Sequence, residues 1–265
     1  MNTPARGNRP RQRSARALAA EALAPVLAGR GSLSDSLPPA LAACRAEDRG
    51  LLQALVFTTA RHALHYRALL KPLLSKAPEP VIEALLLLGL AQLRELRTPD
   101  HAALSETVEA ARQLGRDKLT GLINAVLRRY QREQGELEKG AAVMAHAHPL
   151  WLVQQLRRDW GETGGDALAT SPILAANNSE APLTLRVNTL QGSREDYLAA
   201  LTASGLAAQA CTYAANALTV EGAGDVRLLP GFETGRVSVQ DEAAQLAAQL
   251  LEAKAGMRVL DACAA

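Results

Sequence analysis

The chain has 265 residues, enough for two ordinary domains, and its apolar content of 48% is sufficient to build their cores. The formal net charge is only +2, but lysine occurs at just five positions, so the cationic residues are almost all arginines. Arginine suits phosphate recognition, although a coding bias of the genome explains the same excess equally well. The cysteines, at positions 44, 211 and 263, are too far apart for a disulfide framework or a zinc site.

Residues 1–12, rich in proline, glycine, asparagine and arginine, are expected to be a disordered basic tail. The tail either lies along an RNA backbone or is simply solvated. It lacks the apolar core of a signal peptide, so a cytoplasmic protein is expected. The most apolar run, residues 84–93, is too short to span a bilayer and predicts a helix that is buried on all sides.

A helical pattern continues from residue 13 to about residue 134. The first apolar stripe, over residues 15–26, contains Pro25, which should kink or shorten its helix. Residues 48–74 predict a second helix or pair of helices. A third helix is predicted to begin at residue 81 and to end before the Thr-Pro pair at residues 98–99. The side chains expected to face inward in the second segment are Leu51, Leu52, Leu55 and Val56.

Two further stripes complete the helical region. The fourth, with Leu104, Val108 and Ala111, should end at Gly115, a residue suited to a helix C-terminus. The fifth has apolar side chains at i, i+3, i+4, i+7, i+8 and i+11, and arginines on its remaining surface. Those positions are Leu119, Leu122, Ile123, Val126, Leu127 and Tyr130, with Arg128, Arg129 and Arg132 outside. Five or more such helices predict a compact all-α domain over residues 13–135.

Residues 133–147 are polar and alanine-rich, so they are expected to form a linker or hinge. An amphipathic helix should follow to residue 160, with Trp151, Leu152 and Leu156 on one side. From residue 182 the pattern changes: strand-like alternation over residues 183–188, a helix over 194–202 and a short strand over 217–220 predict a small α+β subdomain.

The last segment predicts the opening of another domain. Residues 235–241 read as a strand, residues 241–254 as a helix, and residues 257–261 as a buried strand that leads into small residues. In a doubly wound α/β domain such small residues let the backbone approach a nucleotide-like ligand. The rest of that sheet does not follow, so the chain is expected to be the front part of a larger enzyme.

Eight short segments follow one another along the chain in a specific order. They are residues 31–34 (GSLS), 48–49 (DR), 101–109 (HAALSETVE), 121–129 (GLINAVLRR), 148–149 (HP), 183–188 (LTLRVN), 229–232 (LPGF) and 238–241 (SVQD). In this order they resemble the bacterial RNA (cytosine-5) methyltransferases that act on small-subunit ribosomal RNA and carry an N-terminal domain similar to NusB. Each segment is weak evidence alone, but the ordered set is specific, and the resemblance runs from about residue 14 to the last residue.

The resemblance implies a multidomain architecture. A NusB-like all-α helical bundle would be followed by a small α+β RNA-recognition-like subdomain, and then by the first helix and strand of a Rossmann-like α/β methyltransferase domain. The expected boundaries are a basic tail at 1–12, the helical domain at 13–135, a linker with a connecting helix at 136–181, the α+β subdomain at 182–236 and the start of the methyltransferase domain at 237–265.

The resemblance also implies chemistry. Members attack carbon 6 of cytosine with a cysteine thiolate and take the methyl group from S-adenosyl-L-methionine, and a second cysteine helps to release the product. Both cysteines lie beyond the strand at which this chain ends, so no residue here is assigned a catalytic role. Cys263 instead belongs, by resemblance, to the cofactor loop with Ala264 and Ala265, and this short stretch alone is not expected to hold the cofactor.

Small-subunit ribosomal RNA is the expected partner, with no metal and no membrane, and the chain is expected to be a monomer. Arg128, Arg129 and Arg186 are the candidate RNA contacts, although a solvated helix face or structural ion pairing accounts for them as well. The histidines at 62, 65, 101 and 146 have no partners at metal or triad spacing and are expected to be structural. Aromatic residues make up only 3%, which argues against a base-stacking surface. The competing hypothesis is a non-catalytic NusB-like RNA-binding or antitermination module.

Overall fold

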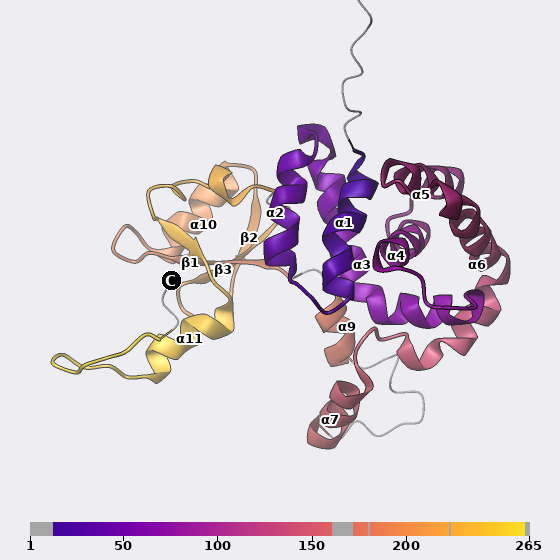
Figure 1. Cartoon of the computed structure of the whole chain (residues 1–265). Coiled ribbons are helices and arrows are strands. Elements are labelled where there is room, and N and C mark those ends of the chain that lie inside the picture. The colour runs from indigo at the N-terminus through magenta and orange to yellow at the C-terminus, as the bar shows by residue number, and fades with distance from the viewer. Residues whose placement is uncertain (1–12, 161–171, 180, 223, 263–265) are drawn as a thin grey trace, which may run out of the picture. The chain divides into compact units, whose positions relative to one another are not determined.

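The computed structural model describes residues 13–160, 172–179, 181–222 and 224–262 of the chain (Figure 1). The predicted basic tail, residues 1–12, lies outside the described residues. The chain forms two compact units, residues 1–179 and 180–265.

The first unit is helical, as the apolar periodicity predicts. Four of its long helices, α3 to α6, follow the predicted stripes. The helices are α1 (Ala15–Leu27), α2 (Leu33–Ala43), α3 (Arg49–Leu70), α4 (Pro80–Arg94), α5 (Asp100–Gln113), α6 (Thr120–Gly140), α7 (Leu150–Trp160) and α9 (Pro172–Asn178). Short 3-10 helices cover Ala46–Asp48, Lys71–Leu73, Asp117–Leu119 and Ala142–Met144.

Local signals explain where several helices begin and end. Ser14 caps α1, because its hydroxyl accepts a hydrogen bond from the backbone N–H of Ala17 at 3.3 Å. Pro25 lies in the last turn of α1, and the helix ends two residues later, as predicted. The turn after α5 uses Gly115 at φ +69°, a conformation that favours glycine, so the predicted helix end is confirmed.

Helix α4 is the centre of the first unit. Its residues from Ala84 to Gln92 are all buried, which confirms the expectation of a helix covered on every side. Gly89 lets α6 approach closely: a Cβ atom at this position would lie 2.6 Å from Cδ1 and 2.7 Å from Cδ2 of Leu127. The α4–α6 contact therefore depends on the absence of a side chain at position 89.

Several expectations about the first unit are wrong in detail. Leu51 and Leu122, expected to face inward, have exposed fractions of 36% and 40%. Helix α2 lies within the predicted helical region but was not singled out as a separate element, and it forms although the pair Pro38–Pro39 within it normally disfavours helix. The linker expected from residue 133 is helical up to Gly140, since α6 continues and buries Leu137 against the core. Trp151, expected on one side of α7 with Leu152 and Leu156, is 68% exposed, whereas the two leucines are partly buried.

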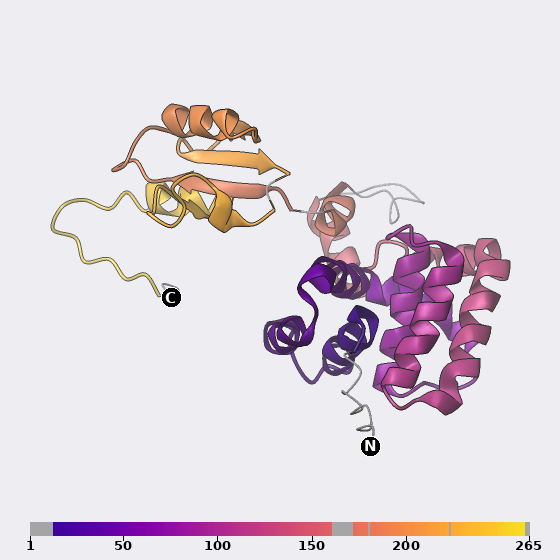
Figure 2. The ribbon, with the colours of Figure 1, turned by 90° about the horizontal axis from the view of Figure 1, so that it is seen from above.

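The second unit is a four-stranded antiparallel sheet in the order β2-β3-β1-β4. Figure 2 shows helices α10 and α11 on opposite sides of its strands. The apolar core under α10 joins Tyr197 and Leu201 to the inward side chains of the strands, such as Leu185 and Leu218. The elements are β1 (Leu183–Val187), α10 (Arg194–Ala203), β2 (Ala207–Ala210), β3 (Ala217–Glu221), a 3-10 helix (Val226–Leu228), β4 (Val237–Val239) and α11 (Glu242–Leu250).

Strand β2 was missed because its sequence, AAQA, has none of the residues that favour strands. It is fixed instead by its pairing with β3, in which Ala208 lies opposite Val220. The strand predicted over residues 257–261 is wrong. These residues pair with no strand among the described residues, and their side chains are exposed. A buried-strand pattern without a neighbouring strand has no ladder of hydrogen bonds to hold it.

Position 231, in the LPGF segment, requires glycine for two structural reasons. Its φ is +70°, and a Cβ atom there would lie 2.5 Å from Cδ and 2.9 Å from Cγ of Arg236. Arg236 itself lies over the Tyr197 ring, with its guanidinium carbon 5.3 Å from the ring centroid. Backbone conformation and packing therefore both require glycine at this position.

Replacing Gly231 by alanine should lower the free energy of unfolding by about 1–2 kcal/mol, because the new methyl group strains the backbone and displaces Arg236 from Tyr197. Chemical denaturation followed by circular dichroism measures this change. Gly205→Ala is the control for backbone strain alone, since its φ is +78° and no atom lies within 4 Å of a Cβ there. An equal effect of the two substitutions would contradict the role given to Arg236.

Candidate RNA interface

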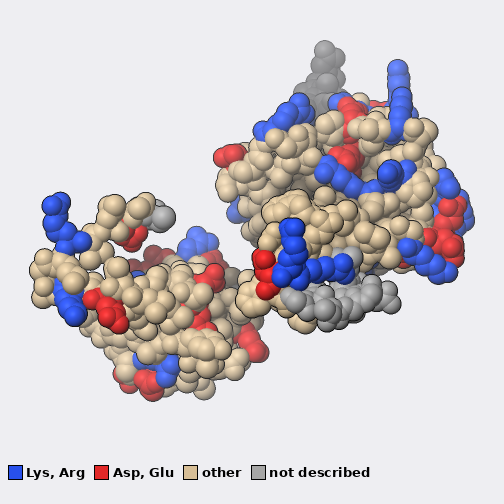
Figure 3. Space-filling view, turned by 90° about the horizontal axis from the view of Figure 1, so that it is seen from below, with Lys and Arg blue, Asp and Glu red and all other residues tan. Residues whose placement is uncertain are grey.

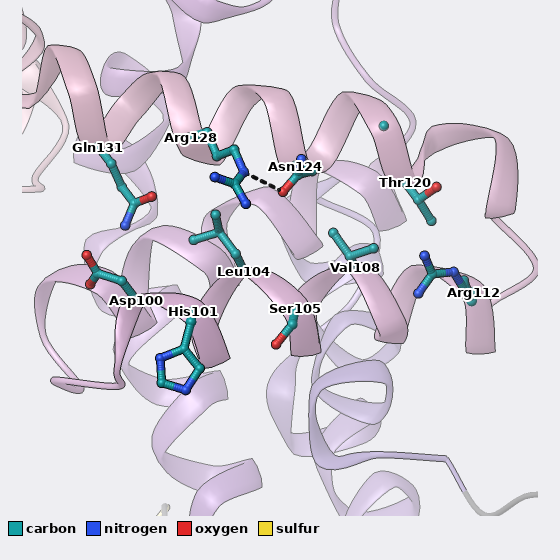
Figure 4. Close-up of a pocket in the computed structure, with 11 residues that line it drawn as sticks. Asp100, His101, Leu104, Ser105, Val108, Arg112, Thr120, Asn124, Arg128 and Gln131 are labelled. Atoms are coloured by element: carbon teal, nitrogen blue, oxygen red, sulfur yellow. Dashed lines mark hydrogen bonds between the residues drawn. The ribbon is translucent and has the colours of Figure 1, made fainter.

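A groove of about 820 Å³ lies between helices α5 and α6 of the first unit. Figure 4 shows that it is lined by side chains from both helices, with Arg128 and Asn124 of α6 above Leu104 of α5, and Arg112 beside Thr120. Two of the sequence segments that carry the family resemblance, residues 101–109 and 121–129, therefore face each other across it. The lining residues are Asp100, His101, Leu104, Ser105, Val108, Arg112, Thr120, Gly121, Asn124, Arg128 and Gln131.

Helical spacing explains why these side chains meet. On α6, Thr120, Asn124 and Arg128 follow one another at intervals of four and so form one row. On α5, Leu104 and Val108 form the apolar floor of the groove, and Arg112 continues the same row. The groove thus has an apolar floor on α5 beside a polar row on α6.

Arg128 is held in the groove by a neutral partner. Its Nε donates a hydrogen bond to Oδ1 of Asn124 at 3.1 Å, and among the described residues no carboxylate forms an ion pair with it. Arg112 is partly neutralised, because its Nη1 lies 3.0 Å from Oε2 of Glu109. A guanidinium oriented by an amide keeps its charge available for an anion, which is the arrangement that phosphate recognition requires.

Arg129, the second predicted RNA contact, faces a different hollow. It forms an i,i+4 ion pair with Glu133 at 2.9 Å, and this hydrogen-bonded carboxylate raises the pKa of the guanidinium. With the exposed Leu122 it lines a hollow of about 670 Å³ beside residues 72–79. Arg129 would have to exchange Glu133 for a phosphate, so it is less available than Arg128.

Arg186, the third predicted contact, belongs to the second unit. It points outward from β1, whereas Leu185 and Val187 on either side are buried. It lines a hollow of about 420 Å³, and among the described residues it forms no ion pair. Asn188, in the same hollow, is structural: its amide donates to the carbonyl of Gly235 at 3.0 Å, and its Oδ1 accepts from the N–H of Leu190 at 3.1 Å.

On the side of the molecule that Figure 3 draws, positive charge is not gathered into one continuous patch. Lysine and arginine side chains are scattered over this side and interleaved with acidic ones. This pattern agrees with the small net charge of the sequence. Recognition of a nucleic acid therefore has to rest on local sites such as the α5–α6 groove rather than on a broad electrostatic field.

His65 belongs to a partly buried polar cluster in the first unit. Nε2 of His65 lies 3.3 Å from Oε2 of Glu138, a carboxylate that also pairs with Arg94. Tyr130 joins them, because its hydroxyl donates to Oε1 of Glu138 at 3.0 Å and accepts from Arg94 at 3.0 Å. Burial, reinforced by the nearby Arg94 guanidinium, lowers the pKa of His65 to about 4.

His146 is held by a second set of contacts. Its Nδ1 accepts a hydrogen bond from the backbone N–H of His148 at 2.9 Å, and its carbonyl accepts from the side chain of Asn178 at 2.8 Å. Burial, followed by the charge of His148, lowers the pKa of His146. His65 and His146 therefore both make contacts that hold the first unit together. Within the described part of the chain, no group of histidine, cysteine and acidic residues is arranged to hold a metal ion.

The predicted cofactor residues Cys263, Ala264 and Ala265 lie outside the described residues. The segment before them is described, and Met257, Val259 and Leu260 have exposed fractions of 59%, 57% and 86%. A cofactor pocket needs an enclosing wall, and these residues do not form one. The described residues of this segment therefore do not fit S-adenosyl-L-methionine.

Sequence reasoning found Arg128 but missed its neighbours. Ser105 and Asn124 lie within the segments that carry the resemblance, yet neither was singled out, and Arg112 was also overlooked. The spacing of four between the polar residues at positions 120, 124 and 128 could have indicated these neighbours, because it places the three side chains in one row beside the apolar stripe.

Among the helices that the structure describes, none has both the length and the apolar character needed to cross a membrane.

Two family models match the chain, one within the first unit and one that runs from the end of the first unit into the second. Residues 13–132 match the model of the NusB family, and residues 148–227 match that of the RsmF/B-like methyltransferase ferredoxin-like domain. A solved protein, PH0851, has a similar fold, with a TM-score of 0.58 at 17% identity, over 96% of this chain and 57% of that one.

Relatives with higher sequence identity include proteins named ribosomal RNA small subunit methyltransferase B. The protein from Pseudomonas putida is 48% identical over 256 residues, which cover 94% of this chain and 57% of the relative. The protein from Vibrio cholerae is 41% identical and is covered to 58%. The chain thus spans somewhat more than half the length of these relatives. On these matches, the chain is similar to proteins named ribosomal RNA small subunit methyltransferase B over the NusB-family and ferredoxin-like parts that it contains.

Proposed function

We propose that this chain binds small-subunit ribosomal RNA through the α5–α6 groove of its NusB-family domain. The observation that carries the proposal is the guanidinium of Arg128, which Asn124 orients and no described carboxylate neutralises. The name of the relatives supplies the class of ligand. RNA places a phosphate at every nucleotide, so a fixed guanidinium beside a polar groove matches its repeating charge.

The lining of the groove suits a backbone contact. Arg112 and Arg128 supply charge, and the hydroxyl of Ser105 and the amide of Asn124 supply neutral hydrogen-bonding groups. The floor formed by Leu104 and Val108 is apolar, and these charged and hydrogen-bonding groups lie around it. Arg129 and Arg186 are proposed as weaker, secondary contacts.

The reaction proposed for the longer relatives is methyl transfer from S-adenosyl-L-methionine to carbon 5 of a cytosine. This chain would contribute RNA placement to that reaction rather than catalysis, and it would act as a monomer in the cytoplasm. Exposure of residues 257–261 supports this division, because the described segment next to the predicted cofactor loop encloses no ligand. S-adenosyl-L-methionine would supply the methyl group when bound elsewhere in a longer protein.

The alternative function is a non-catalytic antitermination module, which the match of residues 13–132 to the NusB family favours. The match of residues 148–227 to an RsmF/B-like methyltransferase domain favours instead the hypothesis that the chain is part of a methyltransferase. A simple antitermination factor has no evident use for the second unit. Preferential binding of the chain to an antitermination RNA over ribosomal RNA fragments would support the alternative.

Arg128→Glu should weaken binding to fragments of small-subunit ribosomal RNA about tenfold, and it should lower the slope of log affinity against log salt by about one. Fluorescence anisotropy at several KCl concentrations measures both quantities. The matched control is Arg30→Glu, which makes the same charge change at an exposed position outside the groove. Equal losses in the two variants would show that net charge, and not the groove, accounts for binding.

Isothermal titration of the chain with S-adenosyl-L-methionine should give no binding heat, because the described residues before the predicted cofactor loop enclose no pocket. The same protein sample should bind ribosomal RNA, which shows that it is folded and competent. Tight cofactor binding by this chain would refute the proposed division of roles.

A further inference from the structure

Helix α7 exposes an aromatic ring that no described part of the fold buries. Trp151 is 68% exposed, and in this helix only Val153 is buried. The chain has two tryptophans, and the other, Trp160, is also on α7. The residues are nine positions apart, which is two and a half turns at about 3.6 residues per turn, so the rings project from opposite faces of the helix.

The face that carries Trp151 is polar around the ring. The residues at i+4 and i+7, Gln155 and Arg158, lie in the same row and are exposed. Nη2 of Arg158 donates a hydrogen bond to Oε1 of Gln155 at 2.7 Å. The amide of Gln155 in turn donates to the carboxylate of Asp159 at 2.8 Å, so it spaces that carboxylate from the guanidinium. The row therefore presents an indole, an amide and an oriented guanidinium.

These neighbours distinguish between possible partners. A docking face for another protein would place aliphatic side chains beside the ring, so that the buried centre of the interface is apolar. Here the neighbours on the row are an amide and a guanidinium, which would be left desolvated in such an interface. A nucleotide matches the row, because its base has an apolar face and its phosphate is an anion.

We propose that Trp151 stacks on a base of single-stranded RNA while Arg158 binds an adjacent phosphate. The site lies on α7, apart from the α5–α6 groove, and rests on the proposed function only in taking RNA as the ligand. It also changes one expectation from composition: few aromatic residues argue against a stacking surface, but one exposed indole beside a guanidinium is sufficient to hold one base.

The test uses the full chain carrying Trp160→Phe, in which Trp151 is the sole tryptophan and reports by its fluorescence. An unstructured oligouridine of twelve nucleotides should quench this fluorescence, and a blunt RNA duplex of the same length should not. In an otherwise unchanged chain, Trp151→Ala should weaken oligouridine binding about fivefold or more, as expected for the loss of one stacked base. Trp151→Phe should retain most of the affinity, and Trp160→Ala should bind like the unaltered protein.

Several results would overturn the stacking contact: absence of oligouridine binding, absence of quenching, or an unchanged affinity in Trp151→Ala. Quenching that grows with protein concentration without RNA would show that a second polypeptide covers the ring, and it would also refute the proposal. Arg128→Glu separates this site from the groove. If that variant binds ribosomal RNA normally while Trp151 is still quenched, the groove proposal fails and the stacking contact stands.

Discussion

Gly89→Ala should lower the free energy of unfolding by about 2 kcal/mol, although alanine is the better helix former by about 1 kcal/mol. The reason is the α4–α6 contact: the new methyl group would lie 2.6 Å and 2.7 Å from the two terminal carbons of Leu127. Leu127 is fully buried, so its side chain has no room to turn away without disturbing the core. Urea denaturation followed by circular dichroism measures the change.

Gly135→Ala is the matched control for this substitution. Gly135 is also inside a helix, α6, but it is exposed and no atom lies within 4 Å of a Cβ at its position. Alanine there should raise stability by about 0.5–1 kcal/mol through helix propensity alone. The double variant Gly89→Ala with Leu127→Ala should show strong coupling, because removal of the leucine makes room for the methyl group. Independent, additive effects would show that the two side chains do not meet.

Acidification from pH 6.5 to about pH 4 should destabilise the first unit, and His65 should contribute on the order of 2–3 kcal/mol of the loss. The pKa of His65 in the folded protein is lowered to about 4, below its value of about 6.5 in the unfolded chain. Between these values the unfolded chain binds the proton more readily. Stability is therefore fully present above pH 6.5 and falls as the pH decreases toward 4. The lowered pKa values of His62 and His146 act in the same direction.

The measurement is a series of denaturation curves between pH 7.5 and pH 4. His65→Gln should flatten the dependence on pH, whatever its effect on stability at pH 7, because the residue no longer takes up a proton. His101→Gln changes an exposed histidine in the groove and should leave the acid-induced loss in place. If the slope of stability against pH in His65→Gln matches that of the unaltered chain, His65 is not the group responsible.

The helical half of the fold was predictable because its apolar residues repeat at helical spacing. The run over α4 and the stripe ending at Gly115 gave elements whose bounds agree closely with the structure. The pattern failed where tertiary contacts decide: α2 forms despite Pro38 and Pro39, and β2 forms from alanines because β3 provides its hydrogen bonds. The strand expected at residues 257–261 failed for the opposite reason, since no neighbouring strand supports it.

The candidate site was predictable only in part. Arg128 was singled out as an arginine on the polar side of a clear apolar stripe, but the sequence does not show that α5 lies beside it. Asn124, Ser105 and Arg112 become candidates only after the two helices are packed together. The exposure of Trp151 was also not predictable from the sequence, because a tryptophan in an amphipathic helix normally lies on the buried side.

The short outer strands of the second unit bear on aggregation. An unpaired strand edge is a template for another chain, and long, flat, aliphatic edges promote association between sheets. Here the two edges are β2, with four residues, and β4, with three. An intermolecular ladder on either edge would gain few hydrogen bonds, so the brevity of these strands protects the domain against edge-to-edge polymerisation.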